Sequence, residues 1–327
     1  MSENPMEHSS STEKNADNPG WEREVIEKLA FAAVTEQKKT RRWGIFFKGL
    51  MAAYLLVLLG VATYPKFKKE MGSTGKAHTA VIDLVGVIAE SEETNAAAII
   101  KGLRAAVKNT DTKGILIHAN SPGGSPVQAD YVFEEIRAIK AKNPDLPIYA
   151  VVSDICASGC YYIASAADKI YVNPASIVGS IGVIMNGFGF VDAMSKFGVE
   201  RRLITAGEHK AMMDPFSPIN NQETKYMQTL IDQVHQQFIA AIKKGRGDRL
   251  KETPEMFSGL VWTGAESIKL GLVDEIGTED YVATEIIGAK KLENFTQEER
   301  LIDRLVGKMG ASFGQAIGTV LNNWSMR

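Results

Sequence analysis

The pattern of hydrophobic and polar positions divides the N-terminal part of the chain into three segments. Residues 1–20 are rich in Ser, Asn, Glu and Pro and lack any apolar period, which predicts a disordered tail. Residues 21–40 carry apolar side chains at helical spacing and predict an amphipathic helix. Residues 43–64 form an apolar run in which Lys48 is the one charged residue.

This apolar run predicts a transmembrane anchor. A helix needs about 20 mostly apolar residues to cross a bilayer, and aromatic residues at both ends of such a run are typical of membrane interfaces. Basic residues are slightly more numerous before the run than after it, which favours a cytoplasmic N-terminus. No small-residue cleavage site follows the run. We therefore expect a cytoplasmic tail at 1–42, a retained anchor at 43–64 and a linker at 65–76, with a buried core helix as the alternative to the anchor.

From residue 77 the pattern changes to short β-rich runs that alternate with helical stretches. The β-rich runs lie at 80–88, 114–119, 147–152, 169–172 and 200–205, and the helical stretches at 94–107, 127–142 and 221–244. This alternation predicts an α/β domain at 77–290 with repeated β-α-β units and a largely parallel sheet. Apolar positions at helical spacing within 291–327 predict a C-terminal amphipathic helical extension.

Composition and charge narrow the function classes. The 327 residues are 45% hydrophobic and 23% charged, with a net charge of -2, which gives no reason to expect a nucleic-acid partner. The two cysteines, Cys156 and Cys160, are too few for a disulfide framework and lack the spacing of a zinc site. We expect Cys160 to pack into the helix that follows it, with narrowing of a neighbouring pocket as the alternative.

Two loops at the ends of predicted strands are candidates for chemistry, because ligands of parallel sheets bind beyond the carboxyl ends of the strands. Residues 120–124 read NSPGG, and the paired Gly123 and Gly124 can present backbone N–H groups to an anion, although an ordinary turn is equally consistent. Ser158 lies among small residues where a helix begins. That position suits either a nucleophile or a helix cap.

A serine nucleophile needs a base that accepts its proton. The chain has five histidines, and none lies between Ser158 and His209, so a compact Ser-His-Asp arrangement is disfavoured. His118 falls within a predicted strand and is expected to be a packed strand residue. His209 is a candidate base, and its neighbour Lys210 is a second cationic residue at the same place in the sequence.

Five motifs in order resemble the signal peptide peptidase A family of serine peptidases, peptidase family S49, in its short, single-repeat, membrane-anchored form. They are NSPGG at 120–124, ASGCYYIA at 157–164, VGSIGVI at 178–184, GEHKAMMDPFSP at 207–218 and VWTGAESIKLGLVDEIG at 261–277. The resemblance covers about 80–277 and implies a ClpP/crotonase-like fold. The last motif alone is also similar to crotonase-like enzymes that act on acyl-CoA.

The resemblance implies roles for particular residues. Ser158 matches the nucleophile, Lys210 the general base, and Ser180 a serine that orients the base or relays its proton. The oxyanion hole would be formed by the backbone N–H group of Gly159 with that of Gly123 or Gly124. No metal or organic cofactor is implied. Lysine is ordinarily protonated at neutral pH, so a catalytic lysine needs surroundings that disfavour the ammonium form, and the nearby Asp214 would oppose this.

The function implied is a membrane-bound serine endopeptidase that degrades cleaved signal peptides through an acyl-enzyme. Its location would be the bacterial inner membrane, with the N-terminus cytoplasmic and the catalytic domain periplasmic. Family members of this form assemble into rings or domes, so we expect a homo-oligomer in which neighbouring subunits complete the active sites. Two alternatives remain open: a crotonase-like acyl-CoA enzyme and a non-catalytic membrane scaffold.

Overall fold

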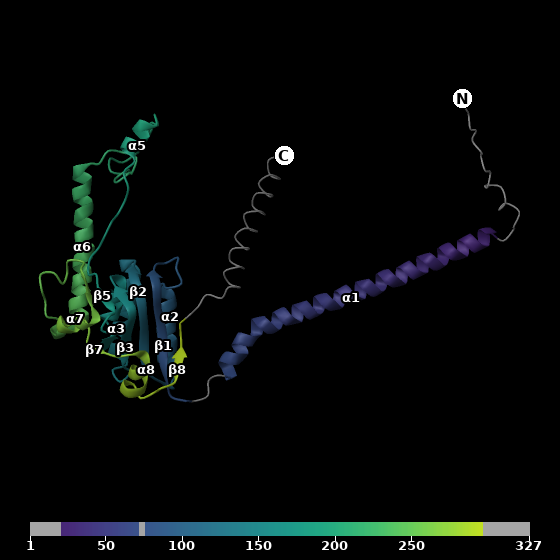
Figure 1. The fold of residues 1–327 in the computed structure, drawn as a ribbon, viewed down its shortest axis with the longest axis horizontal. Coiled ribbons are helices and arrows are strands. Elements are labelled where there is room, and N and C mark those ends of the chain that lie inside the picture. Colours follow the sequence, from purple (N-terminus) through teal and green to yellow (C-terminus); the bar gives the residue numbers. More distant parts are fainter. Residues whose placement is uncertain (1–20, 72–75, 297–327) are drawn as a thin grey trace, which may run out of the picture. The chain divides into compact units, whose positions relative to one another are not determined.

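The computed structural model describes residues 21–71 and 76–296, which belong to two compact units. The first unit, within 1–74, is described here by its helix α1 (Trp21–Met71), shown in purple and dark blue in Figure 1. The helix continues without a break from the predicted amphipathic segment at 21–40 into the apolar run at 43–64.

The transmembrane helix predicted at 43–64 is not supported. Among the described residues, no helix combines the length and the apolar character that crossing a bilayer requires. The side chains of residues 58–64, which complete the predicted run, lie outside the described residues.

The second unit, within 75–327, is built around a sheet that has eight strands in the described part of the chain. They are β1 (His78–Ile88), β2 (Thr112–Gly124), β3 (Ile148–Ala157), β4 (Lys169–Val172), β5 (Ile177–Gly179), β6 (Val261–Thr263), β7 (Glu275–Ile276) and β8 (Leu292–Asn294). The order is β6-β5-β3-β2-β1-β8, and β4 and β7 extend from β3. The pairs are parallel except β5 with β6, so the prediction of an α/β fold with a largely parallel sheet is confirmed.

Both faces of the sheet are covered, as is usual for parallel strands. Ile82 and Leu84 of β1 belong to the main core, under α2 and α3, while Val81 belongs to a smaller core with Tyr171 and Val282. The helices, visible in Figure 1, are α2 (Ala96–Lys108), α3 (Pro126–Lys142), α4 (Gly159–Ala164), α5 (Val191–Lys196), α6 (Asn221–Arg246), α7 (Gly264–Lys269) and α8 (Glu279–Tyr281), with short turns η1 (Gly247–Arg249) and η2 (Val282–Ile286).

Most predicted elements coincide with observed ones, and two differ. The β-rich runs at 80–88, 114–119 and 169–172 lie within β1, β2 and β4. The run at 200–205 forms no strand, because within the described chain it lies in an exposed segment where no sheet edge offers it a partner. Within the C-terminal helical extension predicted at 291–327, residues 292–294 form the strand β8, which pairs with β1, and not a helix. Residues 297–327 lie outside the described residues.

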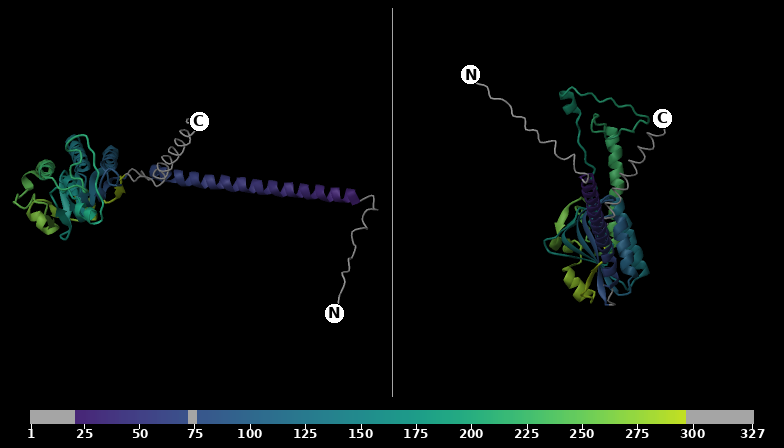
Figure 2. Two further views of the ribbon diagram at one scale, coloured as in Figure 1. Left: turned by 90° about the horizontal axis from the view of Figure 1, so that it is seen from above. Right: turned by 90° about the vertical axis from the view of Figure 1, so that its right-hand side faces the viewer.

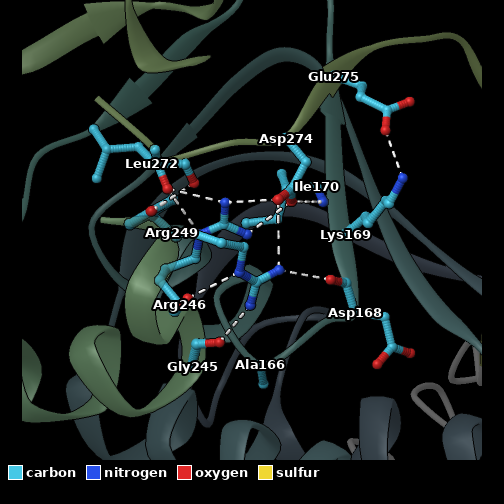
Figure 3. Close-up of polar contacts among 12 residues, drawn as sticks. Ala166, Asp168, Lys169, Ile170, Gly245, Arg246, Arg249, Leu272, Asp274 and Glu275 are labelled. Carbon is cyan, nitrogen blue, oxygen red and sulfur yellow. Dashed lines mark hydrogen bonds and ion pairs between the residues drawn. The ribbon is translucent and has the colours of Figure 1, made fainter. Parts of the chain in front are cut away.

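A buried ion pair fastens the end of α6 to the sheet (Figure 3). The Arg246 side chain has no exposed surface, and its two terminal nitrogens donate to the Asp274 carboxylate at 2.8 and 3.0 Å. Asp274 also accepts a hydrogen bond from the N–H of Ile170 on β4. Burial raises the pKa of Asp274, but the hydrogen bonds and charge of Arg246, the N–H of Ile170 and the charge of Arg249 together outweigh burial and hold this pKa below its ordinary value.

Asp274→Ala is expected to lower the free energy of unfolding by about 3–5 kcal/mol, because it leaves the buried guanidinium without a counter-charge. The part of the free energy of unfolding that results from the lowered pKa of Asp274 is fully present at neutral pH. It is lost as the pH falls below about 4, toward the pKa of Asp274 in the folded protein. Denaturant melts at neutral and acidic pH measure both effects. Glu266→Ala, in an exposed pair with Lys269, is the control and should change stability by less than about 1 kcal/mol. Equal effects of the two variants would contradict this account.

Candidate active site

Ser158 lies at the turn between β3 and α4. Its φ and ψ are 53° and -123°, a conformation that costs a non-glycine residue energy. Its N–H donates to the carbonyl of Gly179 on β5 at 2.8 Å, and its carbonyl accepts from the N–H of Tyr162 at 2.9 Å. Within the described structure, the hydroxyl makes no capping hydrogen bond to α4. The helix-cap alternative for Ser158 is therefore not observed.

The paired glycines at the end of β2 pack directly against this turn. Gly123 has a φ of +100°, and a Cβ atom there would lie 2.7 Å from the Gly159 nitrogen and from the Ser158 Cβ. A Cβ atom on Gly159 would lie 3.3 Å from the Gly124 nitrogen. The Gly123 N–H donates to Ser121 Oγ at 3.1 Å. The close approach of the two backbone segments thus requires glycine at position 123 and brings the nitrogens of Gly124 and Gly159 near each other.

Ser180 lies next to Ser158 across the β3–β5 pair. It directly follows β5, has a φ of 54°, and donates its N–H to the carbonyl of Leu260 at 2.7 Å. In the described part of the chain, three non-glycine residues have a positive φ, and Ser158 and Ser180 are two of them. Strained backbone of this kind gathers at functional sites, so both serines are candidates for a role in the site.

A cavity of about 510 Å³ opens over this cluster. Ser158, Gly159, Ser180 and Gly124 supply polar groups to its wall. The remaining lining is mostly apolar and includes Tyr162, Val183, Ile184, Val234 and Phe238. This volume is typical of ligand sites, and the apolar lining suits apolar side chains of a substrate.

Lys210 is not among the residues that line this cavity in the described structure. It lies in the segment 183–220, which is most of the connection between β5 and α6 and includes α5, and its side chain is exposed. Next to it, His209 Nδ1 lies 3.2 Å from Glu223 in the first turn of α6. Glu223 and Val234 are separated by roughly 16 Å along α6, at 1.5 Å per residue. Ser158 and Ser180 therefore share one site, whereas Lys210 is remote from it in a single chain.

Asp214, whose negative charge was predicted to favour the charged form of Lys210, contacts two other residues. Its carboxylate accepts a hydrogen bond from Ser217 Oγ at 2.8 Å and pairs with Arg201 at 3.5 Å. The hydrogen bond from Ser217, followed by the charge of Arg201, holds the pKa of Asp214 below its ordinary value. The negative charge of Asp214 is thus directed at Arg201.

The segment 183–220 exposes large apolar side chains. Ile184, Phe188, Phe197 and Ile204 are each more than 80% exposed. Figures 1 and 2 show α5 near the end of α6 that points away from the sheet. Large apolar side chains that are exposed together are typical of surfaces that bind another protein or a membrane.

His118 takes part in a polar cluster that the sequence did not reveal. It was expected to be packed in a strand, but it is 28% exposed, with Nδ1 3.0 Å from Asp83 and Nε2 3.1 Å from Ser153 Oγ and 3.4 Å from Glu279. The hydrogen bond to Asp83 raises the pKa of His118, as does the charge of Glu279. Asp83, His118 and Ser153 are not among the residues that line the cavity beside Ser158 in the described structure. In the described residues, no group of three or more His, Cys, Asp or Glu side chains is arranged to hold a metal ion.

The two cysteines form a disulfide across the Ser158 turn. Cys156 is the penultimate residue of β3 and Cys160 lies in the first turn of α4, with 5.1 Å between their Cα atoms. The expectation that Cys160 only packs into the helix was incomplete. Two cysteines four residues apart can lie on one face of a helix or can form a disulfide. Because the chain changes direction at Ser158, Cys156 lies in β3 and Cys160 in α4, and the two side chains form the disulfide.

Comparison with known proteins identifies a family that the chain matches. Residues 140–293, which include β3, the Ser158 turn and segment 183–220, match the model of peptidase family S49. A protein from Methanocaldococcus jannaschii named as a candidate protease is 30% identical over 220 residues, which are 65% of this chain and 70% of that protein. A protein from Enterococcus faecium named as a candidate signal peptide peptidase is 30% identical over 64% of this chain and 63% of its own length.

A further relative has a different name. The Brucella melitensis protein named Na(+)/H(+) antiporter NhaA is 37% identical over 213 residues. Those residues are 65% of this chain but only 29% of that protein. This chain thus spans less than a third of the Brucella protein, most of which lies outside the match.

Proposed function

The chain belongs to peptidase family S49, a family of serine peptidases, and from this premise we propose that it is an endopeptidase with Ser158 as nucleophile. One observation carries the proposal. Ser158 is held at a positive φ, without a capping bond in the described structure, at the wall of an apolar cavity and beside the backbone nitrogens of Gly124 and Gly159.

The proposed reaction proceeds through an acyl-enzyme. Ser158 Oγ attacks the carbonyl carbon of a peptide bond while a base accepts its proton. The oxyanion that develops is stabilised by the N–H groups of Gly159 and Gly124, since the Gly123 N–H already donates to Ser121. The base returns the proton to the leaving amine, and water then releases the acyl group.

The proposed base is Lys210 of a neighbouring subunit. Within the described part of one chain, Lys210 is exposed and is not among the residues that line the cavity of Ser158 and Ser180, whereas Val183 and Ile184, at the start of the same segment, are. The exposed apolar side chains of this segment support docking on a second copy, in a closed ring or dome. Docking would bury Lys210, disfavour its ammonium form and bring it within reach of Ser158, with Ser180 orienting it. His209, paired with Glu223, is the weaker candidate.

Signal peptides are the proposed substrates. Their apolar segments suit the lining of the cavity by Val183, Val234 and Phe238, and the Enterococcus relative carries the name of a signal peptide peptidase. An extracytoplasmic location of the domain is supported by the disulfide, because such bonds persist in oxidising compartments. The bacterial inner membrane as the site of action stays a prediction.

Labelling with a fluorophosphonate probe and mapping by mass spectrometry tests the proposal. We expect one labelled peptide that carries the adduct on Ser158, with much slower labelling of the Lys210→Ala variant. A crotonase-like acyl-CoA enzyme or a non-catalytic scaffold predicts no adduct. An unlabelled Ser158, or an adduct on Ser153 instead, would contradict the proposal.

A further inference from the structure

The disulfide joins the residues on either side of the proposed nucleophile. Cys156 lies two residues before Ser158, and Cys160 lies two residues after it. Both cysteine side chains have no exposed surface. We propose that this disulfide positions Ser158 for catalysis and that its reduction slows turnover without unfolding the domain. The inference rests on the proposed role of Ser158 as nucleophile.

The backbone at Ser158 depends on outside constraints, because its φ of 53° is a conformation that non-glycine residues avoid. One constraint is the hydrogen bond from its N–H to Gly179, and another is the bond that its carbonyl accepts from Tyr162. The disulfide adds a covalent constraint between the end of β3 and the first turn of α4. These three links together fix the direction of the Ser158 side chain.

A general stabilising role explains the disulfide less well. The stabilisation that a disulfide gives through the unfolded chain grows with the length of the closed loop, and the loop here spans a separation of only four residues. Cys156 is already held by the pairing of β3 with Ser121 of β2 and Val178 of β5. The main effect of the disulfide is therefore to fix the position of Cys160 relative to the sheet. This also fixes the neighbouring Gly159, whose N–H group is proposed to stabilise the oxyanion.

Reduction changes this geometry. A dithiol transfers two electrons and two protons to the disulfide, so the bond between the sulfur atoms breaks, two thiols form and the reagent closes into its own disulfide. Two thiols need more room than two bonded sulfur atoms, and neither side chain has solvent beside it. Cys160 is thereby displaced from Cys156, and Ser158 moves relative to the N–H groups of Gly124 and Gly159.

The test measures cleavage of a quenched-fluorescent apolar peptide by the full chain before treatment with dithiothreitol and after treatment prolonged until two thiols can be titrated, since the buried disulfide is poorly accessible to the reagent. We expect kcat to fall roughly 10- to 100-fold, because a displacement of about 1 Å at a reacting group has an effect of this size. KM should change little, and reoxidation with oxidised glutathione should restore kcat. The rate at which a fluorophosphonate labels Ser158 should fall and recover in parallel.

The Cys156→Ala, Cys160→Ala double variant is the matched control. It should have a low kcat that dithiothreitol does not change, with a circular dichroism spectrum like that of the wild type. If the wild type with two titratable thiols keeps its full kcat and labelling rate, the positioning role is wrong while the peptidase assignment stands. Unfolding upon reduction would show a structural staple and also overturn the inference. If the oxidised wild type neither cleaves nor labels, the proposed function fails, and this inference fails with it.

Discussion

Ser158→Ala is expected to lower kcat for peptide cleavage by about 10⁴- to 10⁶-fold, the range seen when a serine peptidase loses its nucleophile. The physical reason is that Ser158 Oγ forms the acyl bond in the proposed reaction. The fold should be retained, because the side chain makes no capping bond in the described structure. The measurement is steady-state cleavage of a fluorogenic peptide, with circular dichroism as a check of folding.

Ser153→Ala is the matched control for this loss. Ser153 lies on the same strand, β3, but its hydroxyl contacts His118 instead of the cavity over Ser158. We expect its kcat to stay within about twofold of the wild type. Substantial activity of Ser158→Ala would remove Ser158 as nucleophile, and a large loss in Ser153→Ala would point to the His118 cluster.

Lys210→Ala is expected to lower kcat by about 10⁴-fold or more, because the proton of Ser158 then has no acceptor. Lys210→Arg should be equally inactive, since the guanidinium keeps the positive charge but does not deprotonate in proteins. Comparison of Lys210→Ala with Lys210→Arg therefore distinguishes a lysine that acts as a base from one that supplies only positive charge. Cleavage rates across a range of pH measure it.

Lys225→Ala serves as the control for Lys210, because Lys225 is also exposed and lies on the first turns of α6. Its cleavage rate should match that of the wild type. A Lys210→Arg variant that keeps most of its activity would contradict the assignment of Lys210 as base. His209→Ala then becomes the informative variant, because His209 is the other candidate.

The elements around Ser158 could be predicted because their signals are local. Alternating β-rich and helical stretches predicted the parallel order of β1, β2 and β3, and the rule that sites follow the carboxyl ends of strands directed attention to Ser158 and to Gly123-Gly124. The run at 200–205 was predicted wrongly, because β-rich composition does not create a partner strand.

Interactions between distant residues could not be predicted from local patterns. Asp83, His118 and Glu279 meet only once β1, β2 and α8 are assembled, and the pairing of Arg246 with Asp274 joins α6 to the sheet in the same way. The meeting of Ser158 with Lys210 is more remote still, since we propose that it requires a second copy of the chain.

Mixed oligomers of the two inactive variants test this central claim most directly. Ser158→Ala and Lys210→Ala subunits are coexpressed with different tags, and oligomers that contain both are purified. If Lys210 acts on Ser158 of a neighbour, the mixture should regain roughly a quarter of the wild-type kcat, since random closed assembly gives that fraction of sites both intact groups. Mixed oligomers that form but stay as inactive as either variant alone would contradict catalysis across the subunit interface.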